Sequence, residues 1–212
     1  MAPNSQANTG EHKVVAVASI AAELHAVMKV AWGVSLAAKN AKVMSAQAGE
    51  KALGFQPITN FIDEIAHQAI SGVGEINDEA LKLSRIAVYE QRADDAYRRF
   101  KSVMEKHNGT RYIGSLKEGM HRAEENMIAS RTEFKKCVNR LVVLLDAMDE
   151  CMLSACSIAS VSRIVTSNTG EYRTNLQVVA NGLQEAAMYI KKKVSDSYEH
   201  LRSANLIPNQ HR

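Results

Sequence analysis

The stretch FKKCVNRLVVLLDAMDECMLSACSIASVSRIV, residues 134–165, decides the fold class of this chain. Apolar and small residues recur along it at alternating steps of three and four, and neither proline nor glycine interrupts them. A seam sustained at a period of 3.5 residues is typical of coiled-coil helices. The predicted seam of this helix is Ile113, Leu116, Met120, Ala123, Met127, Ser130, Phe134, Cys137, Leu141, Leu144, Met148, Cys151, Ala155, Ile158, Ser162 and Val165.

The same spacing runs outward from this stretch in both directions. The second helix carries Ile58, Ile62, Ile65, Ala69, Gly72, Ile76, Glu79, Leu83, Ile86, Glu90, Ala93, Tyr97, Phe100 and Met104. The first carries Ala16, Ile20, Glu23, Val27, Val30, Val34, Ala37, Ala41 and Met44, and the last carries Val179, Leu183, Ala186 and Ile190 before slipping to Val194, Tyr198 and Leu201. The pattern predicts helices at 12–48, 56–106, 112–167 and 174–204.

Three glutamates interrupt the predicted seams, namely Glu23, Glu79 and Glu90. A buried carboxylate without a partner is costly. We therefore expect each glutamate to have a partner or a route to solvent, or the helices to slip at these points.

The composition agrees with long helices. The chain has 212 residues, of which 46% are hydrophobic and 5% aromatic, and it contains only 3 prolines. Sandwiches and barrels need frequent turn signals and β-branched or aromatic strands, which are missing, and nothing resembles the Gly-rich loop of a parallel α/β fold. Short connections predict that helices adjacent in sequence pack antiparallel. The expected fold is all-α, a long antiparallel four-helix coiled-coil bundle.

The charge balance and the two ends of the chain limit the partners and the cellular compartment that we expect. The net charge of +3 makes nucleic acid an unexpected partner. Residues 1–11 form a polar lead that we expect to be disordered, and 205–212 form a tail. No secretory signal is evident, and the longest nearly apolar run, 14–22, is too short to span a membrane. These features predict a soluble protein of the cytoplasm.

The candidate metal and catalytic groups are sparse. Cys137, Cys151 and Cys156 have no CxxC spacing, so we expect free thiols and no zinc site. Glu64 and His67 form one E-x-x-H half-motif, whereas a di-iron bundle needs two. No nucleophile and base can be paired along the helices. We expect no metal, no cofactor and no catalysis.

An internal repeat divides the chain into two parts. Gly49-Glu50 and Gly170-Glu171 lie 121 residues apart, and the same shift brings the seams of both halves into line. Because 121 is not a multiple of seven, matching heptads alone do not explain the alignment. The repeat predicts two tandem hairpins, at 12–106 and 112–204.

The first copy carries a resemblance to a known family. Residues 36–55, LAAKNAKVMSAQAGEKALGF, resemble the hairpin tip of methyl-accepting chemotaxis proteins. The matching residues are Leu36, Ala38, Asn40, Ala41, Ala46, Ala48, Gly49, Glu50, Gly54, Phe55 and Ala66. The resemblance implies a hairpin that builds a four-helix bundle and whose tip contacts a chemotaxis histidine kinase, a coupling protein or other receptors. One chain with two hairpins would be a monomeric pseudo-dimer, and a homodimer is the other option.

The implied partner-binding tip can be named by residue. Its predicted members are Asn40, Val43, Met44, Gln47, Gly49, Glu50, Leu53 and Phe55, with Asn168, Gly170 and Glu171 from the second copy. Met44, Gln47 and Leu53 stand where the family carries charged residues, and only Glu50 is kept. No convincing methylation segment is found, Glu124-Glu125 being the nearest candidate. Two alternatives stay open: a helical scaffold or antagonist with another protein partner, and a ligand- or metal-binding bundle.

Overall fold

The computed structural model describes residues 7–106, 114–167 and 169–208, and within them it is built from helices without a strand. The long helices are α1 (Ala7–Gln47), α2 (Gln56–Lys106), α3 (Gly114–Thr166) and α4 (Arg173–Ser203). Two short 3-10 helices, η1 (Gly49–Phe55) and η2 (Gly170–Tyr172), precede α2 and α4. The all-α prediction is confirmed, although α1 begins at Ala7 and so includes part of the lead that was expected to be disordered.

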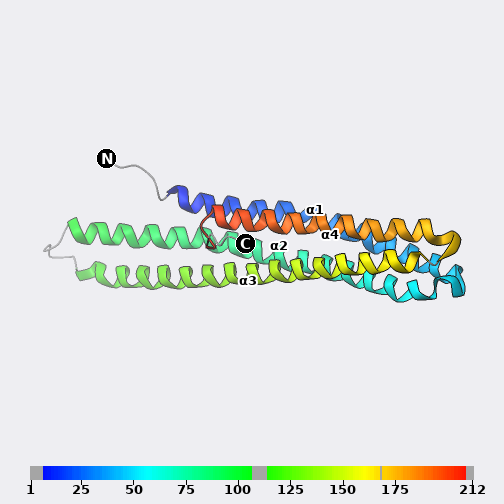
Figure 1. Ribbon diagram of the computed structural model, residues 1–212. Coiled ribbons are helices and arrows are strands. Elements are labelled where there is room, and N and C mark those ends of the chain that lie inside the picture. The colour runs from blue at the N-terminus through cyan, green and yellow to red at the C-terminus, as the bar shows by residue number, and fades with distance from the viewer. Residues whose placement is uncertain (1–6, 107–113, 168, 209–212) are drawn as a thin grey trace.

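The long helices pack side by side (Figure 1). α1 contacts α2 and α4, and α3 contacts the same two helices. The fully buried residues Leu24, Ile62, Leu145 and Leu176 represent one continuous apolar core to which all four helices contribute. The two tips, η1 and η2 with their flanking turns, lie at one end of the molecule (Figure 1).

Ion pairs between the helices show which parts of neighbouring helices lie at the same height along the bundle. The Lys13 ammonium pairs with Glu90 of α2 at 2.8 Å, and Asp94, one turn further along α2, pairs with Arg131 of α3 at 2.5 Å. On the other side of the bundle, Lys191 of α4 pairs with Asp149 of α3 at 3.3 Å.

α2 and α3 are longer than their neighbours. Beyond Glu90, which pairs with the start of α1, α2 continues to Lys106. The end of α2 and the start of α3 therefore form a two-helix arm beyond α1 and α4 (Figure 1). Within the arm, seam residues such as Tyr97, Phe100 and Met120 are only half-buried, because no third or fourth helix covers them.

The core seam differs from the predicted one in a regular way. In each helix one heptad column was predicted correctly, for example Ile20, Val27 and Ala41 in α1. The second column is centred one residue later than predicted, although several predicted residues beside it, among them Ile58, Ile65, Ala123 and Cys137, are buried as expected. Its buried members are Val17, Leu24, Ala31 and Ala38 in α1, Ala66, Val73, Ala80 and Ala87 in α2, Val138, Leu145, Met152 and Ala159 in α3, and Ala180 and Ala187 in α4, where the column continues into Val194 and Leu201 as predicted.

This shift explains the glutamates on the predicted seams. Leu24 enters the core in place of Glu23, and Ala80 enters it in place of Glu79. Burial of apolar side chains in place of carboxylates is strongly favoured. Glu23 instead lies at the edge of the core, where it accepts a hydrogen bond from the Lys193 ammonium, as Glu90 does from Lys13. The expected partners are thus found for Glu23 and Glu90.

Burial repeats along the chain with the 121-residue shift. Equivalent residues share the same burial: Ile20 and Leu141, Leu24 and Leu145, Ala38 and Ala159, Ala41 and Ser162, Ser45 and Thr166, Phe55 and Leu176, Ile62 and Leu183, Ala66 and Ala187, and Val73 and Val194 are all buried. Gly49 and Gly170 also adopt nearly the same backbone conformation, with φ of 57° and 61°. The two halves of the chain therefore match in burial at these positions and in the conformation of the turn glycine, although η1 has seven residues and η2 three.

Candidate functional site

The first tip is a tight turn that a buried hydrogen bond and packing against α3 stabilise. Gly49 enters the left-handed region, which a residue without a Cβ reaches at no steric cost. The buried hydroxyl of Ser45 donates to the Ala52 carbonyl at 3.0 Å and so ties the end of α1 to η1. A Cβ on Gly54 would meet the Val165 side chain at 3.4 Å, because the end of α3 packs directly against this turn.

The second tip uses hydroxyl groups in the same role. The Thr169 hydroxyl donates to the Thr166 carbonyl at 2.8 Å, and the Thr166 hydroxyl donates to the Arg163 carbonyl at 2.9 Å. Both threonine side chains are buried. These bonds satisfy carbonyls at the end of α3 that have no partner within the helix.

Most predicted tip residues that the structure describes lie at the surface. Asn40, Val43, Gln47, Gly49 and Glu50 are exposed, as are Gly170 and Glu171, whereas Met44 is half-buried. The spacing of Asn40, Val43 and Gln47 puts them on one face of α1. Asn168 and the side chain of Leu53 lie outside the described residues.

Phe55 differs in burial from the exposed members of the predicted set. Its side chain is fully buried and belongs to the core, next to the turn that it follows. It therefore presents no surface of its own and supports the tip from within the core. Val161 and Ile164 were not in the predicted set, although both are exposed on α3 at the positions equivalent to Asn40 and Val43. The 121-residue shift was the signal that could have found them.

Neither a family model, nor a curated protein, nor a solved structure matches this chain.

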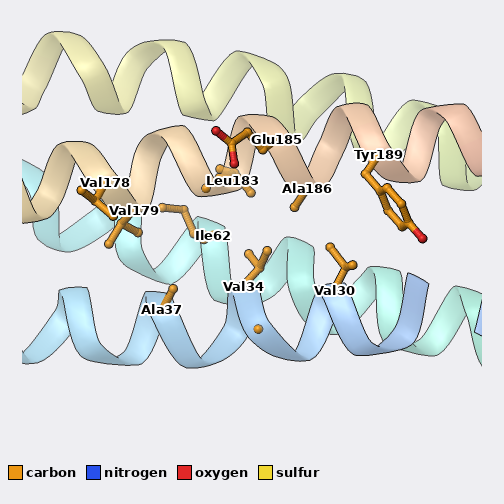
Figure 2. Close-up of a pocket in the computed structure, with 12 residues that line it drawn as sticks. Val30, Val34, Ala37, Ile62, Val178, Val179, Leu183, Glu185, Ala186 and Tyr189 are labelled. Atoms are coloured by element: carbon orange, nitrogen blue, oxygen red, sulfur yellow. The ribbon is translucent and has the colours of Figure 1, made fainter. Parts of the chain in front are cut away.

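A second feature is an apolar groove between α1 and α4, with a volume of about 460 Å³ (Figure 2). Val30, Val34 and Ala37 line it from α1, and Ile62 of α2 lies behind them. The lining from α4 is Val178, Val179, Gly182, Leu183, Glu185, Ala186 and Tyr189, and Gly33 completes it from α1. Glu185 and Tyr189 supply the polar groups of this lining.

Small side chains open this groove. A Cβ on Gly33 or on Gly182 would meet no atom within 4 Å. At the positions equivalent to Gly182, Ala186 and Ala37, the seam between α2 and α3 carries bulkier residues, namely Phe61, Ile65 and Ile158. The sequence pattern had predicted Val30, Val34 and Ala37 as core residues, but all three are only half-buried, Val30 and Ala37 because the seam is shifted and Val34 because it borders the open groove.

α1 has an unusual surface for a bundle helix. The segment Val15–Gln47 is long enough and apolar enough to cross a membrane. The core helix of a soluble protein can meet the same criteria of length and composition. Only 33% of the most apolar 18-residue stretch of this segment is buried inside the molecule. Trp32, Leu36 and Val43 are accordingly exposed.

The remaining chemical groups form no larger constellation. Within the described ranges, no three His, Cys, Asp or Glu residues are grouped so that they could hold a metal ion. His67 is exposed and lies 3.6 Å from the Asp63 carboxylate. Cys137, Cys151 and Cys156 are free thiols, and burial raises the pKa of Cys137 and of Cys151. A raised thiol pKa lowers the thiolate fraction, which is unfavourable for a nucleophile.

Proposed function

We propose that this chain is a non-catalytic signalling protein of the cytoplasm that contacts a chemotaxis histidine kinase, a coupling protein or receptors through its tips. The observation that carries the proposal is the pair of matched tips, in which Gly49 and Gly170 hold the same conformation and exposed Glu50 and Glu171 follow them. Exposed apolar and acidic residues on a packed support suit recognition by another protein. The resemblance of residues 36–55 to chemoreceptor tips names the class of partner.

We infer that the architecture behind these tips is an antiparallel four-helix coiled coil made from two tandem hairpins, 12–106 and 112–204. The polar pairs favour it, because early residues of one helix meet late residues of the next, as Lys13 meets Glu90. The repeated burial at a shift of 121 residues favours an internal duplication. One chain would then supply what chemoreceptors build from two subunits, and a change in helix packing would be felt at the tips.

A pull-down with chemotaxis kinase and coupling protein tests this function. We expect the wild-type chain to retain one of them, and the double variant Glu50→Ala with Glu171→Ala to bind at least about tenfold more weakly, as loss of a central contact does. Glu105→Ala is the matched control, because Glu105 is equally exposed but lies near the far end of α2. Absence of kinase, coupling protein and receptors from the bound fraction would refute the proposal.

The groove between α1 and α4 favours a second candidate function, the binding of an apolar ligand. Its volume and its nearly apolar lining are typical of small-molecule sites. We expect an apolar fluorescent probe such as anilinonaphthalene sulfonate to bind the wild-type chain, and Gly182→Leu to abolish that binding by filling the groove. Equal probe binding by both proteins would speak against a ligand site here.

A further inference from the structure

Two straight stripes of exposed side chains run along opposite sides of the molecule. The α1 stripe is Ala22, His25, Lys29, Trp32, Leu36, Lys39 and Val43, and the α3 stripe is Val143, Asp146, Glu150, Leu153, Ser157, Ser160 and Ile164. Every member is exposed, and alternating steps of three and four keep each stripe on one face of its helix. α1 and α3 each pack against α2 and α4, so the two stripes face away from each other.

Both stripes are unusually apolar for surfaces that face solvent. In the α1 stripe, Trp32 is 56% exposed and Leu36 is 62% exposed. In the α3 stripe, Leu153 is 51% exposed and Ile164 is 72% exposed. Rows of large exposed apolar side chains at coiled-coil spacing mark interaction surfaces more often than isolated ones do.

The charges of the two stripes are complementary. The α1 stripe contains Lys29, Lys39 and His25 but no acidic residue, and the α3 stripe contains Asp146 and Glu150 but no basic residue. Neither Lys29 nor Glu150 forms an ion pair with another residue in the part of the chain that the structure describes. Asp146 is exposed and accepts a hydrogen bond from the Tyr198 hydroxyl at 2.6 Å.

The stripes also match in register. The shift of 121 residues that relates the two halves of the chain takes Lys29 to Glu150 and Trp32 to Leu153. It likewise takes His25 to Asp146 and Val43 to Ile164. α1 and α3 both end at the tips, which lie together at one end of the molecule (Figure 1), so residues equally far from the two tips lie at about the same level.

We propose that the α1 stripe of one copy of this chain packs against the α3 stripe of a second copy that lies beside it in the same orientation. This arrangement brings Lys29 of one copy opposite Glu150 of the next and Trp32 opposite Leu153. Since the two stripes lie on opposite sides of the molecule, each copy keeps one of them free. The contact is heterologous, and further copies extend it into a row or a ring.

The contact is expected to be weak and sensitive to salt. Each stripe is about 30 Å long at the helical rise of 1.5 Å per residue and only one helix wide. Such an area lies below that of a stable dimer interface. Exposed charge pairs are screened as the ionic strength rises. Association is therefore expected only at high protein concentration.

Sedimentation velocity of the full chain over a range of concentrations tests the proposal. We expect larger species that grow with concentration and decline between about 50 mM and about 500 mM salt. Lys29→Glu alone and Glu150→Lys alone should each weaken association at least about tenfold, because like charges then face each other. The double variant, and an equimolar mixture of the two single variants, should recover it to within about threefold, since both restore opposite charges.

Lys101→Glu and Glu105→Lys are matched controls, because both residues are exposed on α2 away from the stripes. They should leave association unchanged. Circular dichroism checks that every variant stays helical. A wild-type chain that is monomeric at all concentrations overturns the proposal, as does a double variant that fails to recover. Loss on Lys29→Glu without loss on Glu150→Lys also overturns it, because the contact then does not join these two residues.

Discussion

Gly49 and Gly170 shape the tips because the left-handed backbone region penalises every residue that carries a Cβ. Nothing lies within 4 Å of a Cβ added to Gly49, so the requirement comes from the backbone and not from crowding. The sequence showed both glycines and their spacing. Their shared conformation follows from the need of each tip to reverse the chain within a few residues.

Gly49→Ala should destabilise the protein by about 1–2 kcal/mol, the cost of a left-handed non-glycine residue. Gly74→Ala is the control, because Gly74 lies inside α2 with open space around its Cα. That substitution should instead stabilise by about 1 kcal/mol, since alanine favours the helix. Urea unfolding measures both, and equal effects of the two substitutions would contradict the role of the tip glycine.

The Glu23–Lys193 pair makes stability depend on pH. The hydrogen bond from Lys193 lowers the pKa of Glu23 from its ordinary value of 4.5, and the bond to Glu23 raises the pKa of Lys193 above 10.5. The contribution of Glu23 is therefore present above about pH 4.5 and is lost as the pH falls through its folded pKa. The contribution of Lys193 is present below about pH 10.5 and is lost as the pH rises through its folded pKa.

Glu23→Gln should consequently flatten the acid side of the stability profile, by less than about 1 kcal/mol because the pair is partly exposed. Urea midpoints measured from neutral pH down to pH 3 test this. Glu64→Gln is a suitable control, since Glu64 is exposed and forms no ion pair among the described residues. An unchanged acid limb in Glu23→Gln would show that the pair does not form in solution.

At the scale of elements, the sequence predicted where the helices lie. It predicted the residues of their buried seam only in part. One heptad column of each helix was unambiguous. For the other, neighbouring apolar residues such as Leu144 and Leu145 allowed two choices. Packing against the neighbouring helices selected the later residue, because it buries Leu24 and Ala80 and leaves Glu23 and Glu79 at the edge. Periodicity within one helix cannot make that choice.

The arm gives a test at this scale. A Cβ on Gly119 of α3 would meet ring atoms of Phe100 of α2 at 3.0 Å. The absence of a side chain at Gly119 therefore lets the Phe100 ring pack against α3. Gly119→Ala should therefore lose part or all of the stabilisation, about 1 kcal/mol, that Gly74→Ala gains from helix propensity. Urea unfolding of the two variants compares them directly. A full gain in Gly119→Ala would mean that Phe100 does not pack there.

At the scale of the whole molecule, one core joins both halves of the chain. Leu24 in the first half and Leu145 in the second are equivalent and fully buried. Leu24→Ala and Leu145→Ala should each destabilise by about 2–5 kcal/mol, the range for a buried leucine. Because the four helices share the core, we expect a single unfolding transition in both variants.

Circular dichroism and Trp32 fluorescence can follow that unfolding, since Trp32 is the only tryptophan of the chain. The two probes should report the same transition. Two separate transitions would show that the two halves of the chain fold independently and would argue against a common core.

The sequence by itself determined the helical class, the helix bounds to within about five residues, the tip glycines and the 121-residue repeat, because helix periodicity, the scarcity of proline and the turn glycines are local signals. Tertiary structure alone decided that Phe55 is buried, which seam column forms the core, and that a groove opens between α1 and α4. It also decided that the two complementary stripes face outward on opposite sides. These features depend on which helices pack against one another, and the sequence pattern of a single helix does not specify its neighbours.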